Sequence, residues 1–114
     1  MRLIASLIIV TLCSPLWGGD WQQFRGNPAG GIARHETPPT EWNATDQTNI
    51  AWKAELPGKG PSGPIVVGDR VFVTCSSNHN QDRLHVLCFD TETGKRLWHR
   101  QFWATGRTHC HPTS

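Results

Sequence analysis

The sequence lacks an excess of charge of one sign, because 11 Lys and Arg residues stand against 9 Asp and Glu residues. Nucleic-acid-binding domains need a basic stripe, and polybasic membrane anchors need a cluster of cations, so neither class is favoured and no nucleic-acid partner is expected. The chain also lacks an amphipathic helical pattern and any apolar run of the roughly 20 residues that span a bilayer. Its composition, 37% hydrophobic and 18% charged, is that of at most one small globular domain.

The amino terminus has the pattern of a secretory signal. Arg2 supplies a positive charge, Leu3–Leu12 form an apolar run, and small or turn-forming residues follow up to Gly19. We therefore expect residues 1–19 to be a signal peptide, with cleavage near Gly18 or Gly19. The mature chain would then begin near Asp20, be periplasmic or secreted, and have no transmembrane segment.

Cysteine usage excludes some metal and haem sites. The sequence has no Cys-x-x-Cys pair, so a Cys-x-x-Cys-His haem site is not supported. Cys75, Cys88 and Cys110 remain after export, and this odd number leaves at least one thiol without a disulfide partner in this chain. Cys75 and Cys88 should lie on neighbouring strands but out of register with each other. We expect them to be small buried core residues.

The remaining sequence predicts an all-β fold, because short β-branched and aromatic runs alternate with Gly, Pro, Asn and Asp. The Gly68-Asp69 pair is typical of a two-residue hairpin turn, and the 90–94 segment is typical of a second turn. We expect one four-stranded antiparallel meander over residues 64–102, with strands at 64–67, 70–76, 83–90 and 95–102.

Alternation along these strands indicates how the sheet is buried. Val71, Val73 and Cys75 share one face, while Phe72 and Thr74 share the other, so both faces are largely apolar. The last predicted strand is more polar, with Arg96, His99, Arg100 and Gln101. A sheet that is buried on both faces and has a polar outer strand fits a β-propeller blade stacked between two others.

The amino-terminal part of the chain is more loop-like. We expect a short strand over 20–25, a loop over 26–39, a strand over 49–56 that contains Trp52, and a turn-rich connection over 57–64. The segments 51–56 and 97–102 resemble each other, and their tryptophans, Trp52 and Trp98, are 46 positions apart. This spacing lies within the roughly 40–50 residues of a propeller blade.

The run from Phe89 to Trp98 resembles the Ala-x-Asp-x-x-Thr-Gly-x-x-x-Trp motif of pyrroloquinoline-quinone-like (PQQ-like) β-propeller repeats. Asp90, Thr93, Gly94 and Trp98 fall on its key positions, and Cys88 stands in place of its Ala. The opening run 20–26 resembles the start of secreted bacterial members of this family. The resemblance implies an architectural motif in which Asp90 and Thr93 bind the amides of a turn, Gly94 adopts a left-handed backbone, and Trp98 closes the seam between blades.

These observations predict four segments: a signal peptide at 1–19, an amino-terminal segment with the outer strand of a first blade at 20–63, one full blade at 64–102, and the truncated start of another at 103–114. Propellers close with about 4–8 blades. We therefore expect an incomplete propeller whose partners are the remaining blades of the same protein and an unidentified protein or small-molecule ligand.

Two functions follow from the resemblance. The first is a non-catalytic binding or scaffolding propeller. The alternative is the amino-terminal part of a PQQ-dependent alcohol or sugar dehydrogenase, which would use PQQ and calcium. Such enzymes have adjacent cysteines, calcium-binding carboxylates and a catalytic Asp, and the sequence has no adjacent cysteine pair. No residue here is assigned to catalysis or to cofactor binding.

A third possibility is a small metal-binding module. His109 and His111 would share one face of a strand and could hold zinc or copper together with His79 or His85. Alternating histidines without Cys-x-x-Cys spacing are not specific for metal binding. The sequence therefore assigns no metal ligand.

Overall fold

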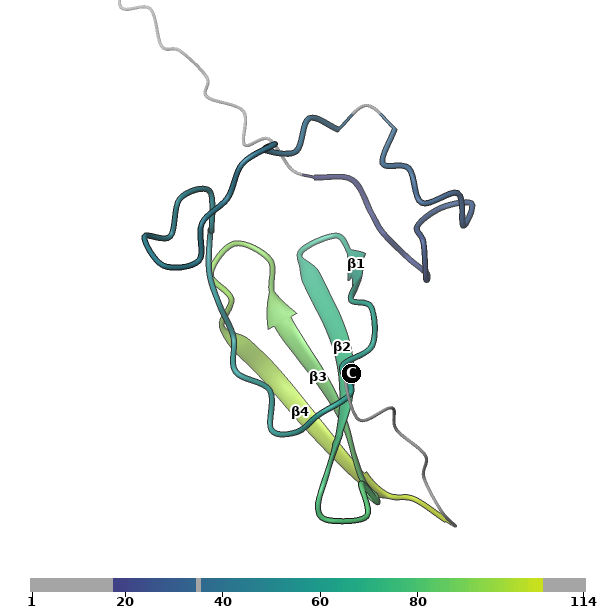
Figure 1. Ribbon diagram of the computed structural model, residues 1–114. Coiled ribbons are helices and arrows are strands. Elements are labelled where there is room, and N and C mark those ends of the chain that lie inside the picture. Colours follow the sequence, from purple (N-terminus) through teal and green to yellow (C-terminus); the bar gives the residue numbers. More distant parts are fainter. Residues whose placement is uncertain (1–17, 35, 106–114) are drawn as a thin grey trace, which may run out of the picture.

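The computed structural model describes residues 18–34 and 36–105, and this part of the chain contains one sheet and no helix. The four strands are antiparallel and follow one another in the sheet (Figure 1): β1 (Ile65–Val67), β2 (Arg70–Ser77), β3 (Arg83–Asp90) and β4 (Arg96–Trp103). The predicted all-β meander is confirmed, and its strand ends agree with the prediction to within one residue. The sheet is open, and its identity as a propeller blade stays a prediction.

Two sequence-based predictions fall largely outside the described residues. These are the signal peptide, of which residues 1–17 are not described, and the histidine cluster around Cys110. Within the described part of the chain, no helix is available that could cross a membrane.

The β1–β2 hairpin turns at the predicted Gly68-Asp69 pair. Gly68 has a φ of +55°, which an L-residue adopts only with strain, and Val67 lies opposite Arg70 across the turn. The amino-terminal segment is attached here, because Asp20 Oδ1 accepts a 2.7 Å hydrogen bond from the Gly68 amide. Trp21 and Val66 also exchange two backbone hydrogen bonds of 2.9 Å. Residues 20 and 21 thus lie beside the end of β1.

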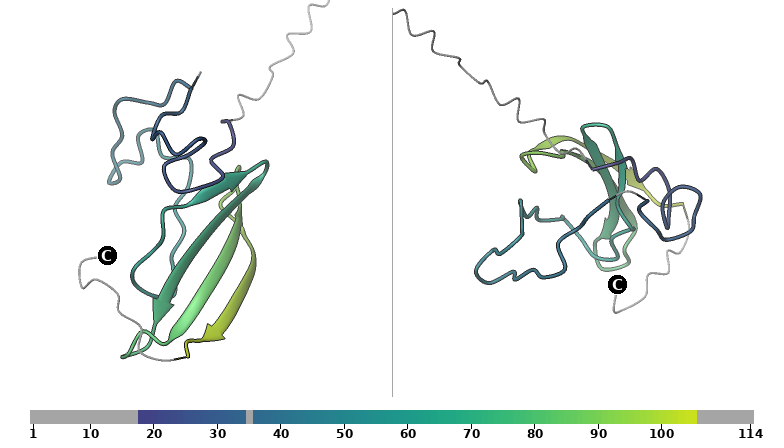
Figure 2. Two further views of the ribbon diagram at one scale, coloured as in Figure 1. Left: turned by 90° about the vertical axis from the view of Figure 1, so that its right-hand side faces the viewer. Right: turned by 90° about the horizontal axis from the view of Figure 1, so that it is seen from above.

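One face of the sheet, called the covered face below, is buried by this chain itself. Its core consists of Val73, Cys75, Leu87 and Phe89, against which Trp52 and Leu56 pack. Figure 2 shows the segment before β1 running along this side of the sheet. The preceding part of the chain therefore supplies the cover that a neighbouring layer would otherwise give.

The opposite face, called the open face, is only partly covered. Phe72, Cys88 and Trp98 lie side by side there across β2, β3 and β4. Cys88 is fully buried, but 39% of Trp98 and 54% of Phe102 are exposed. The prediction that both faces are apolar is consistent with this register, although only one face is covered by the described residues.

Two predicted strands are wrong. No strand forms over 49–56, and the predicted strand over 20–25 is reduced to the single bridge between Trp21 and Val66. A strand requires a neighbouring strand to hydrogen-bond its backbone, whereas the 49–56 segment lies across a sheet face and is fixed by its side chains. The expected outer strand of a first blade is therefore absent from the described residues.

The predicted roles of β4 and of the two cysteines agree with the structure. β4 is an edge strand, and most of its residues are exposed. Cys75 and Cys88 are buried free thiols on opposite faces, because Cys75 lies opposite His85 whereas Cys88 lies opposite Phe72. Burial raises the pKa of both thiols, which keeps them protonated and favours their role as core residues.

Candidate functional site

The turn between β3 and β4 is built around the Asp90 carboxylate. Asp90 Oδ1 accepts hydrogen bonds from the Thr93 hydroxyl at 2.7 Å, the Thr93 amide at 2.9 Å and the Glu92 amide at 3.2 Å. The Lys95 amide donates in turn to Thr93 Oγ1 at 3.3 Å. The bonds from Thr93 are the main reason why the pKa of Asp90 lies below its ordinary value. The hydrogen bonds predicted for Asp90 and Thr93 are thus present.

Gly94 completes the turn and leaves room for a tryptophan from another part of the chain. Its φ is +67°, and its amide donates to the Asp90 carbonyl at 3.0 Å. A Cβ at this position would lie 2.5 Å from Cδ2 of Trp52, so the indole rests directly on the glycine backbone. Only glycine satisfies both the backbone angle and this close approach.

Trp52 is fixed at this position by two further contacts. Its Nε1 donates a 2.7 Å hydrogen bond to the carbonyl oxygen of Thr91, and its ring stacks on Phe89 with centroids 6.3 Å apart and planes at 28°. An aromatic ring that is buried on one side while its polar edge is hydrogen-bonded makes a specific anchor. Trp52, Phe89, Thr91 and Gly94 together are called the tryptophan-docking site below.

Trp98 lies apart from the 90–94 turn, and its predicted role of closing the seam between blades stays a prediction. The indole that closes on the 90–94 turn belongs to Trp52, while Trp98 packs on Phe72 across the open face, with ring centroids 5.9 Å apart. The structure thus gathers Asp90, Thr93 and Gly94 into one turn and places Trp98 on a separate surface. The similarity of segments 51–56 and 97–102 was the signal that could have identified Trp52 as the docked residue.

A row of three polar side chains, which sequence reasoning missed, lies across the covered face beside the apolar core. The Ser77 hydroxyl lies 2.7 Å from Nε2 of His85, and Nδ1 of His85 lies 2.9 Å from Nε2 of His99. His85 is only 4% exposed, and burial is the main reason why its pKa is lowered, followed by the charges of His99 and Arg83. The β3–β4 register, in which Leu87 lies opposite His99, brings these histidines together.

The described residues contain only two of the four histidines that were considered as metal ligands, His79 and His85. No group of three or more His, Cys, Asp or Glu residues in this part of the chain could hold a metal ion. His85 is hydrogen-bonded to Ser77 and His99, whereas His79 lines a cavity that Ser77 also borders. His109 and His111 lie outside the described residues.

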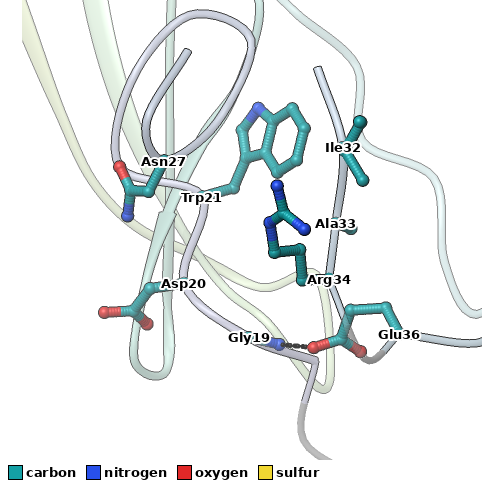
Figure 3. A pocket seen from close by; sticks show the side chains of 8 residues that line it. All are labelled: Gly19, Asp20, Trp21, Asn27, Ile32, Ala33, Arg34 and Glu36. Atoms are coloured by element: carbon teal, nitrogen blue, oxygen red, sulfur yellow. Dashed lines mark hydrogen bonds between the residues drawn. The ribbon is translucent and has the colours of Figure 1, made fainter. Parts of the chain in front are cut away.

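Figure 3 shows a cavity of about 170 Å³ at the amino-terminal segment, in which Arg34 extends toward the indole of Trp21. The Gly19 amide donates a 2.7 Å hydrogen bond to Oε1 of Glu36 at its edge. The bond joins two loop segments that lie beyond the end of the sheet (Figure 1). The hydrogen bond at this cavity therefore serves to hold two loops together. The lining is Gly19, Asp20, Trp21, Asn27, Ile32, Ala33, Arg34 and Glu36.

Comparison of the whole chain with protein-family models, with curated proteins and with solved structures finds no match. The motif in the sequence and the geometry of the tryptophan-docking site are therefore the features that indicate a function.

Proposed function

We propose that this chain is a blade-forming segment of an exported PQQ-like β-propeller repeat protein that acts as a non-catalytic binding or scaffolding surface. The observation that supports this proposal is the tryptophan-docking site. A tryptophan from one repeat of the sequence pattern is held by the Asp-x-x-Thr-Gly turn of the next. Such a contact joins consecutive units, as stacked repeats require.

The position of Trp98 extends the same argument. Trp98 follows Trp52 by 46 residues and has a similar local sequence, but the sequence contains only one Asp-x-x-Thr-Gly turn, which is occupied by Trp52. A further repeat would provide the next turn and cover the open face. The remaining blades of the propeller are therefore the expected partners of this segment.

The non-catalytic role is supported by the use of the motif residues. Asp90, the carboxylate of the motif, has its Oδ1 engaged by the turn, and Gly94 and Thr93 serve the same turn. These residues therefore build the turn, and the dehydrogenase alternative would depend on PQQ-binding and calcium-binding residues elsewhere in a longer protein.

Trp98→Ala tests the proposal in two forms of the protein. One is residues 20–114, and the other is extended by the downstream residues of its reading frame. In the extended protein Trp98 becomes buried, and its truncation should cost about 3–5 kcal/mol of unfolding free energy. In residues 20–114 the loss should be clearly smaller, because Trp98 is 39% exposed. Trp42→Ala, at an exposed loop position, is the control.

Equal losses in the two forms would contradict stacking of a further repeat on the open face. The extended protein should also fail to reduce a redox dye when PQQ, calcium and alcohols or sugars are supplied. Substrate-dependent dye reduction would favour the dehydrogenase alternative instead.

A further inference from the structure

Ser77, His85 and His99 form a continuous row of hydrogen-bonding groups that the blade role does not use. The three side chains come from β2, β3 and β4, and the two contacts between them measure 2.7 and 2.9 Å. A hydroxyl on a histidine that is itself oriented by a third group is the arrangement that activates serine nucleophiles.

The two nitrogens of His85 have separate partners, which determines where its proton lies. A neutral imidazole carries one proton, so Nδ1–H can donate to Nε2 of His99 while the lone pair of Nε2 accepts from the Ser77 hydroxyl. Burial and the nearby charge of Arg83 lower the pKa of His85 and favour this neutral form at pH 7. His85 is therefore prepared to act as a base toward Ser77.

Ser77 also borders a space that a small molecule could occupy. A cavity of about 340 Å³ adjoins it, within the usual size range of ligand pockets, roughly 300–1,000 Å³. Lys59 contributes a positive charge to the lining, and a cation there would favour the oxyanion that forms when a carbonyl is attacked. The lining consists of Pro57, Gly58, Lys59, Ser76, Ser77, Asn78, His79 and Gln81.

We propose that Ser77 is an activated nucleophile that takes an acyl group from a small ester bound in this cavity. As Ser77 Oγ attacks the carbonyl carbon, its proton passes to Nε2 of His85 and a C–Oγ bond forms. The bond to the alcohol oxygen then breaks, and the departing alkoxide takes the proton from His85. Attack by water, through the same base, releases the carboxylic acid and restores Ser77. His99 acts as a positioning residue for His85.

Acetylation by p-nitrophenyl acetate tests the proposal. The exported chain is incubated with this ester, and the modified peptide is identified by mass spectrometry. Acetyl transfer to Ser77 should exceed transfer to Ser62, a serine outside the cavity, at least tenfold, and it should be lost in Ser77→Ala and in denaturant. The control variant Ser62→Ala should leave the acetylation of Ser77 unchanged. Equal labelling of the two serines, or equal labelling with and without denaturant, would overturn the proposal.

The two histidines have distinguishable effects on this reaction. His85→Gln should slow acetylation about 10²-fold or more, the usual contribution of a general base. The folded rate should fall as His85 is protonated at low pH. The groups that influence this titration are Arg83 on β3 and His99 on β4, while Lys59 and His79 lie in the cavity lining.

Because Nε2 of His99 accepts from Nδ1–H of His85 and thereby orients its ring, His99→Phe should slow the acetylation of Ser77. His99→Gln keeps a hydrogen-bond acceptor and should recover part of the rate. An unchanged rate in His99→Phe, or no difference between the two variants, would remove His99 from the mechanism. A His85→Gln protein that retains the wild-type rate would overturn the nucleophile proposal itself.

Discussion

Gly94 and Gly68 are both turn glycines with positive φ, but only Gly94 lies against a side chain. Their φ values are +67° and +55°; a Cβ at Gly94 would meet the Trp52 ring at 2.5 Å, and one at Gly68 would meet nothing within 4 Å. Alanine at either position should cost about 1–2 kcal/mol through the backbone. At Gly94 the displaced indole should add about 1–3 kcal/mol. Denaturant unfolding of Gly94→Ala and Gly68→Ala measures this difference, and equal midpoints would contradict a stabilising role for the docked indole.

Trp52 and Trp98 differ in what their removal should cost within residues 20–114. Trp52 packs on the core and donates to the Thr91 carbonyl. Trp52→Ala should therefore lower the free energy of unfolding by about 3 kcal/mol, the lower end of the range for buried tryptophan. Trp52→Phe keeps an aromatic ring but removes the hydrogen bond to Thr91, and it should lower the free energy of unfolding by about 1 kcal/mol. Trp98→Ala should cost less than Trp52→Ala because it is 39% exposed. A larger loss in Trp98→Ala than in Trp52→Ala would contradict the role of Trp52 as the main aromatic anchor of this segment.

At the scale of strands and turns, the sequence was informative where local chemistry alone sets the geometry. Gly68-Asp69 and the hydrogen-bonding side chains of Asp90 and Thr93 determine the two turns, so the meander was predicted to within a residue. The 49–56 segment was assigned wrongly because an apolar, extended pattern does not reveal whether a neighbouring strand is present. The contact between His85 and His99 was missed because it depends on the β3–β4 register.

The burial of His85 makes the stability of the folded chain sensitive to pH. His85 is buried and its pKa is lowered, so it is neutral in the folded chain while the unfolded chain takes up a proton below about pH 6.5, the ordinary value. The contribution of neutral His85 to the free energy of unfolding is fully present above that pH. It is lost as the pH falls toward the pKa of His85 in the folded chain. The denaturant midpoint should therefore drop between pH 7.5 and 5. His85→Asn should flatten this drop, whereas His79→Asn should not. A midpoint that is constant over this range would contradict the assignment.

At the scale of the whole molecule, one sheet face is only partly covered by the described residues. The apolar residues of the covered face pack against Trp52 and Leu56, but Trp98 and Phe102 remain substantially exposed on the open face. Each large apolar side chain left in water forgoes up to about 1.5–3 kcal/mol of burial energy. A typical domain has a net stability of only about 5–15 kcal/mol, so a few such losses are decisive.

Residues 20–114 should therefore associate through the open face, bind a hydrophobic dye and unfold without a sharp transition, because stacked repeat units complete their cores against one another. Phe102→Asp places a charge on this face and should reduce association in light scattering and sedimentation. Trp42→Asp, an equally drastic change at an exposed loop position, should have no such effect. A monomer with one cooperative thermal transition would show that the amino-terminal segment and a single sheet suffice for a stable fold, and the need for further blades would be contradicted.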